Sequence, residues 1–226
     1  DWADMPTAIS ELAAASIRVI VLGSALEGTF CAGSDIKAMS ALQADPGLVA
    51  QFRTNMREGI DAVAGVTVPT IANIQGDCFG AGVALALACD FRIAGSAARF
   101  GVTPAKLGIT YPVEDIQRLV ACIGQGQTNR LLMSADTIDA AEARRIGLVE
   151  VIGDEDEVRR LSTAITRNAP ASITAMKRLV GRAGVLDSDA LFDSFFAGEA
   201  LAEGLLAFRE KRRAQFADLP PHGTSD

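Results

Sequence analysis

The sequence predicts an α/β fold, and three features of the chain support this prediction. Two short runs rich in β-branched residues, residues 17–22 and 69–75, each end at a glycine, which is typical of strands buried on both faces. Between them, residues 46–63 carry apolar side chains at intervals of three and four, which is the pattern of an amphipathic helix. From residue 125 onward the apolar spacing is almost wholly helical.

The middle of the chain continues the alternation of strands and helices. A glycine-rich turn at residues 80–82 precedes an apolar segment, residues 83–89, that we predict to be a compact helix, and a short strand over residues 91–94 follows. Pro112 is expected to be the first residue of the next helix, because proline suits the first helical position. The expected buried stripe of this helix is formed by Ile116, Leu119, Val120 and Ile123.

The last third of the chain supplies mostly helices. No repeat, low-complexity tract or break in composition marks an independent second domain. We therefore divide the chain into a core, residues 1–160, and a C-terminal helical region, residues 161–226. The elements expected after residue 125 are one strand over residues 148–152 and helices that begin at Asp154 and Pro170 or cover residues 188–196 and 203–216.

The composition indicates a globular protein that does not bind nucleic acid. The chain has 226 residues, is 49% hydrophobic and carries a net charge of -7, whereas a nucleic-acid binder needs a basic face. No stretch approaches the ~20 apolar residues of a membrane span, and no secretory signal pattern is present. We therefore expect a soluble, cytoplasmic protein with neither a nucleic-acid nor a membrane partner.

The cysteines and the single histidine do not indicate a metal site. Cys31, Cys78, Cys89 and Cys122 form no CxxC pair, and His222 lies in a C-terminal tail that we expect to be loose. Isolated cysteines of this kind behave mostly as small hydrophobic residues. The sequence therefore predicts four buried, reduced thiols and no disulfide framework.

Two glycine-rich turns are the candidate catalytic elements. Residues 31–37 follow the first predicted strand, and residues 76–82 precede the apolar helix. Backbone N–H groups in such turns can hold a thioester oxyanion, because small residues let the carbonyl approach the backbone closely. Glycine turns at strand ends are also common structural features, so neither turn identifies a function by itself.

Together, the two turns resemble the signature of a known enzyme superfamily. Residues 30–37, F-C-A-G-S-D-I-K, resemble F-x-A-G-A-D-I-K, and residues 76–90 resemble G-x-x-x-G-G-G-x-E-L-A-x-x-C-D. The segments at residues 168–177 and 203–213 match as well, so the resemblance covers nearly the whole chain. The chain is identified as a member of the crotonase (enoyl-CoA hydratase/isomerase) superfamily of fatty acid metabolism.

The resemblance implies a fold and an assembly. The fold is the crotonase-like (ClpP/crotonase) spiral of repeated ββα units with a C-terminal helical trimerisation region, and the assembly is a homotrimer or a dimer of trimers. The substrate is an acyl-CoA, and CoA is part of it, so no separate cofactor is expected. The family's first strands are expected to precede residue 1, because the chain opens in mid-pattern at Asp1 without an initiator Met.

The resemblance also assigns roles to individual residues. The backbone N–H groups of Ser34 and Ala81 are implied to form the oxyanion hole. Asp35 is expected to fix its loop rather than to perform chemistry. Phe208 and Lys211 are expected to reach a ligand that is held mainly by a neighbouring subunit. The implied substrate-binding and CoA-binding residues are Ala32, Gly33, Asp35, Ile36, Lys37, Gly80, Pro104, Phe208 and Lys211.

The chain departs from the family at the residues that transfer protons. Hydratases divide acid and base work between two glutamates, and these positions are Ala84 and Pro104 here. Residues 103–111, T-P-A-K-L-G-I-T-Y, instead resemble the branch that contains methylmalonyl-CoA decarboxylase, whose active-site tyrosine falls on Tyr111. That branch has a histidine at the position of Ser34, so the resemblance does not define the substrate.

Three acidic or phenolic side chains remain as candidates for the chemistry. Tyr111 is expected at the N-cap of its helix, where its phenol could donate to a substrate carboxylate or thioester oxygen, or could simply pack under the loop. Glu114 and Asp115 could be displaced acids or bases, although acids in a first helical turn are expected from the helix dipole alone.

The preferred reaction is decarboxylation of a malonyl-type CoA thioester, because loss of CO2 needs an oxyanion hole but no base. One alternative is an enoyl-CoA hydratase or isomerase that uses Glu114 or Asp115 as a displaced carboxylate. Another alternative is an acyl-CoA binding protein that has lost catalysis, for which Ala84 and Pro104 are the supporting feature.

Overall fold

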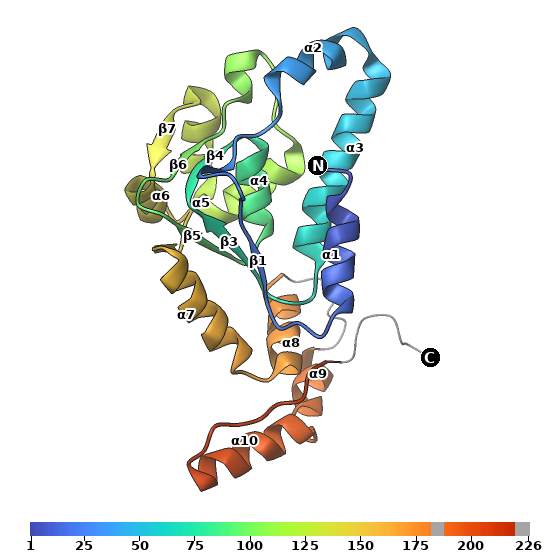
Figure 1. Ribbon diagram of the computed structural model, residues 1–226, viewed down its shortest axis with the longest axis vertical. Helices are drawn as coiled ribbons and strands as arrows, with labels where there is room; N and C mark the ends of the chain where they lie inside the picture. The colour runs from blue at the N-terminus through green and yellow to red at the C-terminus, as the bar shows by residue number, and fades with distance from the viewer. Residues whose placement is uncertain (182–187, 220–226) are drawn as a thin grey trace.

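Two four-stranded sheets form the centre of the molecule in the computed structural model (Figure 1). The structure describes residues 1–181 and 188–219, and for residues 36–38 it describes the backbone only. The first sheet is wholly parallel and has the order β1 (Ile20–Leu22), β3 (Thr70–Ile74), β5 (Phe91–Ala94) and β8 (Val151–Ile152). The second has the order β2 (Gly28–Cys31), β4 (Gly76–Phe79), β6 (Arg99–Gly101) and β7 (Thr137–Asp139), with β7 antiparallel.

Successive strands alternate between the two sheets, which produces repeated ββα units. Each of the pairs β1–β2, β3–β4 and β5–β6 places one strand in each sheet and is followed by helix. The described helices are α1 (Met5–Ala14), α2 (Ile36–Ala44), α3 (Pro46–Gly65), α4 (Ala81–Ala88), the 3-10 helix η1 (Pro104–Leu107), α5 (Val113–Ser134), α6 (Ala140–Ile146), α7 (Glu155–Thr166), α8 (Pro170–Val180), α9 (Ser188–Ser194) and α10 (Glu199–Glu210).

The core lies around α4, because this helix carries no polar side chain. Its sequence, A-G-V-A-L-A-L-A, gives it no hydrophilic face, and all of its residues except Leu87 are buried. A helix that is apolar all round is stable only when it is covered on every side. It packs between α3 and α5, whose apolar stripes include the buried residues Ile60 and Leu119. This packing fixes the N-terminus of α4 beside the sheet edges.

Several predicted element boundaries and several predicted buried side chains were wrong. The helix expected from Pro112 begins at Val113, with Pro112 at the N-cap, and its residue Val120 is exposed rather than buried. The strand expected over residues 148–152 is only β8, and the helix expected over residues 203–216 is α10, which ends where Lys211 adopts a left-handed conformation with φ 53°. Cys31 and Cys122 are only partly buried, in contrast to Cys78 and Cys89.

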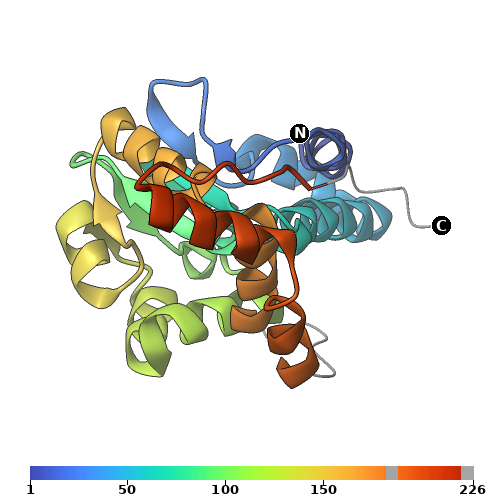
Figure 2. The ribbon, with the colours of Figure 1, turned by 90° about the horizontal axis from the view of Figure 1, so that it is seen from below.

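The C-terminal helices α8, α9 and α10 project from the core at the lower end of Figure 1, and in Figure 2 they stand in front of it. Lys177 of α8 ties them to the core: it lies 2.7 Å from Asp90, the residue before β5, and donates to the Val68 carbonyl at 2.9 Å. Asp90 also accepts from the N–H and hydroxyl of Thr70. Lys177 and Asp90 both belong to segments that resemble the family signatures, so this part of the resemblance has a structural basis.

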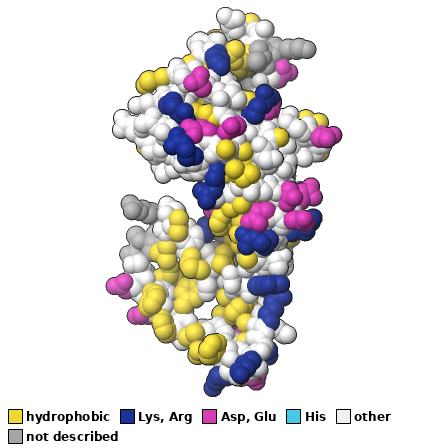
Figure 3. Space-filling view, turned by 90° about the vertical axis from the view of Figure 1, so that its left-hand side faces the viewer, with side chains coloured by type: hydrophobic (Ala, Val, Ile, Leu, Met, Phe, Trp, Pro, Cys, Tyr) yellow, Lys and Arg dark blue, Asp and Glu magenta, His cyan; other side chains and the backbone are white. Residues whose placement is uncertain are grey.

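The projecting helices expose many large apolar side chains. Figure 3 shows them gathered over the lower part of one face, around a hollow. Exposed apolar surface of this extent marks an interaction site in soluble proteins. Within residues 1–181 and 188–219, every helix is too short or too polar to span a membrane. The large apolar residues exposed on α8 to α10 and the short segments that join them are Met176, Leu179, Val180, Phe192, Phe196, Leu201, Leu205, Leu206 and Phe208.

Candidate active site

A cavity of about 1180 Å³ brings together the two predicted glycine-rich turns. Its wall is formed by the turn after β2, the N-terminus of α4, the segment from η1 to the start of α5, and one side of α2 and α3. The predicted residues that line it are Ala32, Gly33, Ser34, Gly80, Ala81, Pro104, Tyr111, Glu114 and Asp115.

The two turns meet because the strands that lead to them are parallel neighbours. Strands β2 and β4 pair with Gly28 opposite Gly76, so both end at the same edge of the sheet. A Cβ atom on Gly33 would lie 2.9 Å from the Phe79 carbonyl oxygen and 3.7 Å from the Ala81 nitrogen. Gly33 also has φ +89°, a conformation that L side chains rarely adopt. The glycine therefore permits a contact between the turns that a larger residue would prevent.

The start of α4 presents backbone donors to the cavity. Ala81 is the first residue of this helix, so its N–H group has no acceptor within the helix and lies at the positive end of the helix dipole. Ser34 lies in the facing turn and lines the same cavity. The structure therefore brings the two predicted oxyanion-hole residues to one cavity, in the setting where helix N-termini bind anions.

The other predicted CoA-binding residues are not all in the cavity wall. Asp35 is exposed, and its backbone carbonyl accepts from the Met39 N–H at the start of α2. The side chains of Ile36 and Lys37 lie outside the described part of the chain. Phe208, 83% exposed, and Lys211 lie at the end of projecting helix α10, and neither lines the cavity.

The two positions that carry the hydratase glutamates hold no proton-transfer group. Ala84 is fully buried inside α4, and its N–H donates to the Gly80 carbonyl oxygen at 3.4 Å. Pro104 opens η1 and lines the cavity. Alanine and proline cannot transfer protons, so acid or base catalysis in this cavity must come from other side chains or from water.

Tyr111 is in the cavity wall, and its hydroxyl is bonded to the backbone of the turn before α4. The phenol is 7% exposed, and its O–H donates a hydrogen bond of 2.9 Å to the Gly80 carbonyl oxygen. Burial, and then the nearby negative charge of Asp115, raise the pKa of Tyr111 well above its ordinary value. The group is therefore a neutral donor that is already bonded to the turn before α4. The expected N-cap position proved wrong, because Pro112 is the N-cap.

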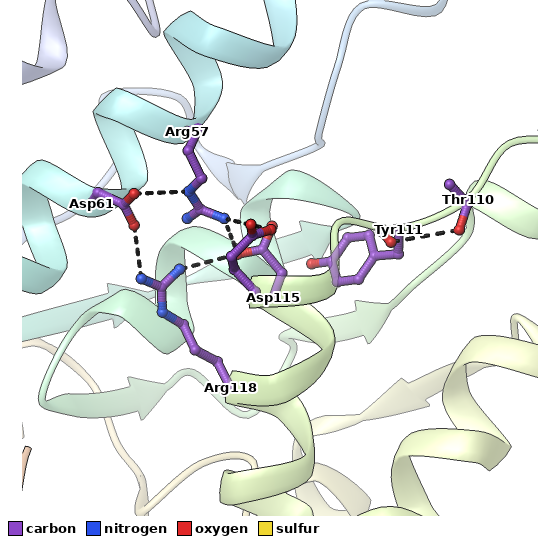
Figure 4. A network of polar contacts seen from close by, with 7 residues as sticks. Arg57, Asp61, Thr110, Tyr111, Asp115 and Arg118 are labelled. Atoms are coloured by element: carbon purple, nitrogen blue, oxygen red, sulfur yellow. Dashed lines mark hydrogen bonds and ion pairs between the residues drawn. The ribbon is translucent and has the colours of Figure 1, made fainter.

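Four charged side chains form a closed ring beside Tyr111 (Figure 4). Asp115 is fully buried, and its Oδ1 accepts from Nη1 of Arg57 at 3.0 Å and from Nη1 of Arg118 at 3.1 Å. Asp61 closes the ring, accepting from Nε of Arg57 at 3.1 Å and from Nη2 of Arg118 at 2.9 Å. Two positive and two negative charges thus compensate each other at the junction of α3 and α5.

Sequence reasoning missed Arg57, although it lines the cavity. The only signal was its spacing of four residues from Asp61, which is common on solvent-exposed helices.

The carboxylate of Glu114 is half-exposed and lies 3.8 Å from Nη1 of Arg57. Asp115 is engaged by two guanidinium groups, so Glu114 is the more accessible of the two predicted carboxylates. The remaining wall is rich in apolar side chains, namely Met39, Leu42, Val49, Phe52, Met56, Leu107, Ile109 and Val113.

Comparison with known proteins connects this geometry to a family. A family model described as enoyl-CoA hydratase/isomerase matches residues 2–219. The chain belongs to this family. The predicted superfamily and the predicted spiral fold are therefore confirmed.

The similarity to individual enoyl-CoA hydratase/isomerase family members extends over most of the chain. Crotonyl-CoA hydratase of Syntrophomonas wolfei is 35% identical, over 94% of this chain and 85% of that protein. Mouse mitochondrial methylglutaconyl-CoA hydratase is 31% identical, over 88% of this chain and 68% of that protein. The crystal structure of an enoyl-CoA hydratase from Bacillus anthracis has a TM-score of 0.88 at 28% identity, covering 95% of this chain and 87% of that one.

Proposed function

We propose that this family member is an acyl-CoA enzyme that stabilises a thioester enolate and forms it by decarboxylating a malonyl-type CoA thioester. The observation that carries the proposal is the meeting of the Ser34 turn and the N-terminus of α4 in one cavity, combined with Ala84 and Pro104 at the hydratase positions. Backbone donors at this point suit an oxyanion, while the usual acid and base are missing from their positions.

The proposed reaction follows from this donor arrangement. The thioester oxygen accepts hydrogen bonds from the N–H groups of Ser34 and Ala81, and the bond to the scissile carboxylate is turned perpendicular to the thioester plane. Its electron pair then becomes the enolate as CO2 leaves, and the α-carbon afterwards takes a proton from water. Donors aimed at charge that develops in the transition state lower the barrier without a base.

The apolar part of the cavity supports loss of CO2 rather than retention of the carboxylate. Phe52, Met56 and Leu107 line the wall, and an apolar surface favours neutral CO2 over a carboxylate. A guanidinium that held the scissile carboxylate would stabilise the reactant instead. Arg57 is bonded to Asp61 and Asp115, so we assign it to the charged ring and not to the reacting group.

A second candidate is hydration or isomerisation of an enoyl-CoA. The observation in its favour is the half-exposed carboxylate of Glu114 in the cavity wall, together with relatives that are named hydratases. Glu114 would then replace the two missing glutamates as acid and base. Asp115 is less suited, because both of its bonded partners are arginines. A third candidate, an acyl-CoA binding protein without catalysis, is favoured only by Ala84 and Pro104.

A turnover panel separates the three candidates. Purified protein is incubated separately with malonyl-CoA, methylmalonyl-CoA, crotonyl-CoA and a 3-enoyl-CoA. The products are separated by chromatography and identified by mass spectrometry. The proposal expects acetyl-CoA or propionyl-CoA from the malonyl-type substrates. Rapid hydration or isomerisation without decarboxylation would support the second candidate. Binding of all four thioesters without any product would support the third.

Assembly and CoA binding form part of the same proposal. We propose a homotrimer or a dimer of trimers in which exposed apolar residues of α8 to α10, including Phe208, contact a neighbouring subunit. Phe208 and Lys211 would there reach CoA in the neighbour's cavity. CoA is part of the substrate, so the proposed reaction needs no further cofactor. Four free cysteines suit the cytoplasm, where thiols stay reduced.

A further inference from the structure

The hydroxyl of Tyr111 is bonded to the same peptide group that carries the proposed oxyanion donor. Its O–H donates to the Gly80 carbonyl oxygen at 2.9 Å. That carbonyl and the N–H of Ala81 are the two ends of one amide. The phenol therefore lies one peptide group away from the proposed position of the thioester oxygen.

We propose that Tyr111 is a positioning residue that orients and polarises the Gly80–Ala81 peptide, so that the Ala81 N–H becomes a stronger donor to the thioester oxygen. This inference rests on the proposed oxyanion hole. It assigns Tyr111 a role through the backbone, in place of direct contact with a substrate carboxylate.

The orienting part of the role follows from the conformation of Gly80. This residue has φ 53° and ψ -117°, and ψ of Gly80 helps to set the plane of the peptide that follows it. Glycine has access to many other values of ψ, because it lacks a Cβ atom. The hydrogen bond from Tyr111 favours the one orientation in which the carbonyl points to the phenol. The Ala81 N–H, on the opposite side of the same amide, is fixed with it.

The polarising part follows from the cooperativity of hydrogen bonds. A carbonyl oxygen that accepts a hydrogen bond draws electron density from the amide nitrogen, so the N–H at the other end becomes a better donor; the strengthening is about 10–30% per bond in a chain. The Gly80 oxygen also accepts from the N–H of Val83 at 2.9 Å and of Ala84 at 3.4 Å. Those two bonds belong to the first turn of α4, whereas Tyr111 brings a donor from a different segment.

Packing alone does not explain why this residue carries a hydroxyl. Phenylalanine has the same ring, and the ring of Tyr111 belongs to the hydrophobic core. Capping does not explain the residue either, because Pro112 is the N-cap of α5. Burial raises the pKa of the phenol well above its ordinary value, so the group is a protonated donor near neutral pH.

The test reads the polarisation of the thioester carbonyl directly. Acetyl-CoA labelled with 13C at its carbonyl is bound to the protein, and the 13C chemical shift is compared with that of free acetyl-CoA in water. Stronger hydrogen bonds to the oxygen move this resonance downfield. Tyr111→Phe removes the hydroxyl and keeps the ring. Thr103→Val is the matched control, because Thr103 lies in the same wall and its side chain makes no capping hydrogen bond.

We expect a downfield shift in the wild type, a clearly smaller shift in Tyr111→Phe and an unchanged shift in Thr103→Val. We also expect Tyr111→Phe to lower kcat by about tenfold with KM within twofold, which corresponds to about 1.4 kcal/mol of transition-state stabilisation. A wild-type shift that Tyr111→Phe leaves unaltered would overturn the inference. A bound wild type with no downfield shift would instead contradict the proposed oxyanion hole.

A second variant covers the case in which Tyr111→Phe folds poorly. Tyr111 is the only tyrosine of the chain, so growth on 3-fluorotyrosine labels this position alone. Fluorine next to the hydroxyl makes the phenol a stronger donor while the ring stays in place. The inference expects the carbonyl resonance of bound acetyl-CoA to move further downfield than in the unlabelled protein. An unchanged resonance would again overturn it.

Discussion

Asp115 of α5 accepts a hydrogen bond of 3.0 Å from Nη1 of Arg57 in α3, and the carboxylate that makes it is fully buried. Arg118 and Asp61 complete the ring around this pair. A buried carboxylate is stable only when its charge is compensated. The ring therefore joins the two helices that enclose α4 and supports one wall of the cavity.

This ring predicts a large loss of stability when Asp115 is removed. Asp115→Ala removes the one buried carboxylate that Arg57 and Arg118 share and leaves them the more exposed Asp61 and, for Arg57, Glu114 at 3.8 Å. Breaking a buried ion pair costs about 3–5 kcal/mol. We expect a decrease in the free energy of unfolding of about 3 kcal/mol, measured by urea denaturation. Arg159→Ala is the control, because its ion pairs are exposed, and we expect no measurable change. Equal stabilities of the two variants would show that the ring is not a structural support.

Crotonyl-CoA hydration is predicted to be very slow. General acid and base groups each contribute ~10²–10⁴ in rate, and Ala84 and Pro104 occupy both usual positions. The measurement is the steady-state rate of crotonyl-CoA hydration, compared with the rate of a hydratase that has both glutamates. If hydration is rapid, Glu114→Gln identifies the displaced carboxylate, with Glu58→Gln as a control on the same wall. If hydration is rapid, and is lost in Glu114→Gln but not in Glu58→Gln, the second candidate function would be favoured over decarboxylation.

Tyr111 is predicted to ionise only well above its ordinary pKa of about 10, because burial and Asp115 both disfavour the phenolate. It is the only tyrosine, so tyrosinate absorbance reports on it alone. Above pH 10 tyrosine in the unfolded chain loses its proton while native Tyr111 keeps it, so stability must fall as pH rises. Tyr111→Phe should lack this part of the decrease. Tyrosinate that forms in the folded protein near pH 10 would contradict the buried hydrogen bond to Gly80.

The sequence allowed the central strands and the glycine turns to be predicted, because both depend on local composition. The run that contains β3 is rich in β-branched residues, Thr70, Ile71 and Ile74, and the glycines at Gly33 and Gly80 are needed where φ is positive. Strands β2, β4, β6 and β7 could not be predicted. They have three or four residues and contain glycine, aspartate or arginine, so their stability comes from pairing with distant strands and not from a local pattern.

The polar part of the site was predicted incompletely for a similar reason. Arg57 with Asp61 and Asp115 with Arg118 are each separated by three or four residues, and either pair alone is typical of an exposed helix face. Only the packing of α3 beside α5 turns them into a buried ring. The direction of the Tyr111 hydroxyl likewise depends on the contact between two segments 31 residues apart, which no spacing along the chain encodes.

Assembly is predicted to depend on the apolar surface of the C-terminal helices. Phe208, 83% exposed, and Leu205 lie on α10, and covering such surface is favourable by ~25 cal/mol per Å². We expect light scattering after gel filtration to show a trimer or hexamer. Phe208→Asp is expected to shift the oligomeric state toward the monomer. Leu26, 72% exposed, lies between β1 and β2 and away from these helices, so Leu26→Asp should leave the assembly intact. A wild-type monomer at micromolar concentration would contradict the shared CoA site of Phe208 and Lys211.

The central claim, that backbone donors of the two turns hold a thioester oxygen, is tested most directly by calorimetry with two matched ligands. Acetyl-CoA carries the carbonyl, whereas S-ethyl-CoA is a thioether of the same length without it, and free CoA measures the remaining contacts. Two hydrogen bonds, from the N–H groups of Ser34 and Ala81, contribute about 0.5–1.5 kcal/mol each. We therefore predict that acetyl-CoA binds at least fivefold more tightly than S-ethyl-CoA. Equal affinities for the two ligands, or no binding of either to folded protein at millimolar concentration, would contradict the account.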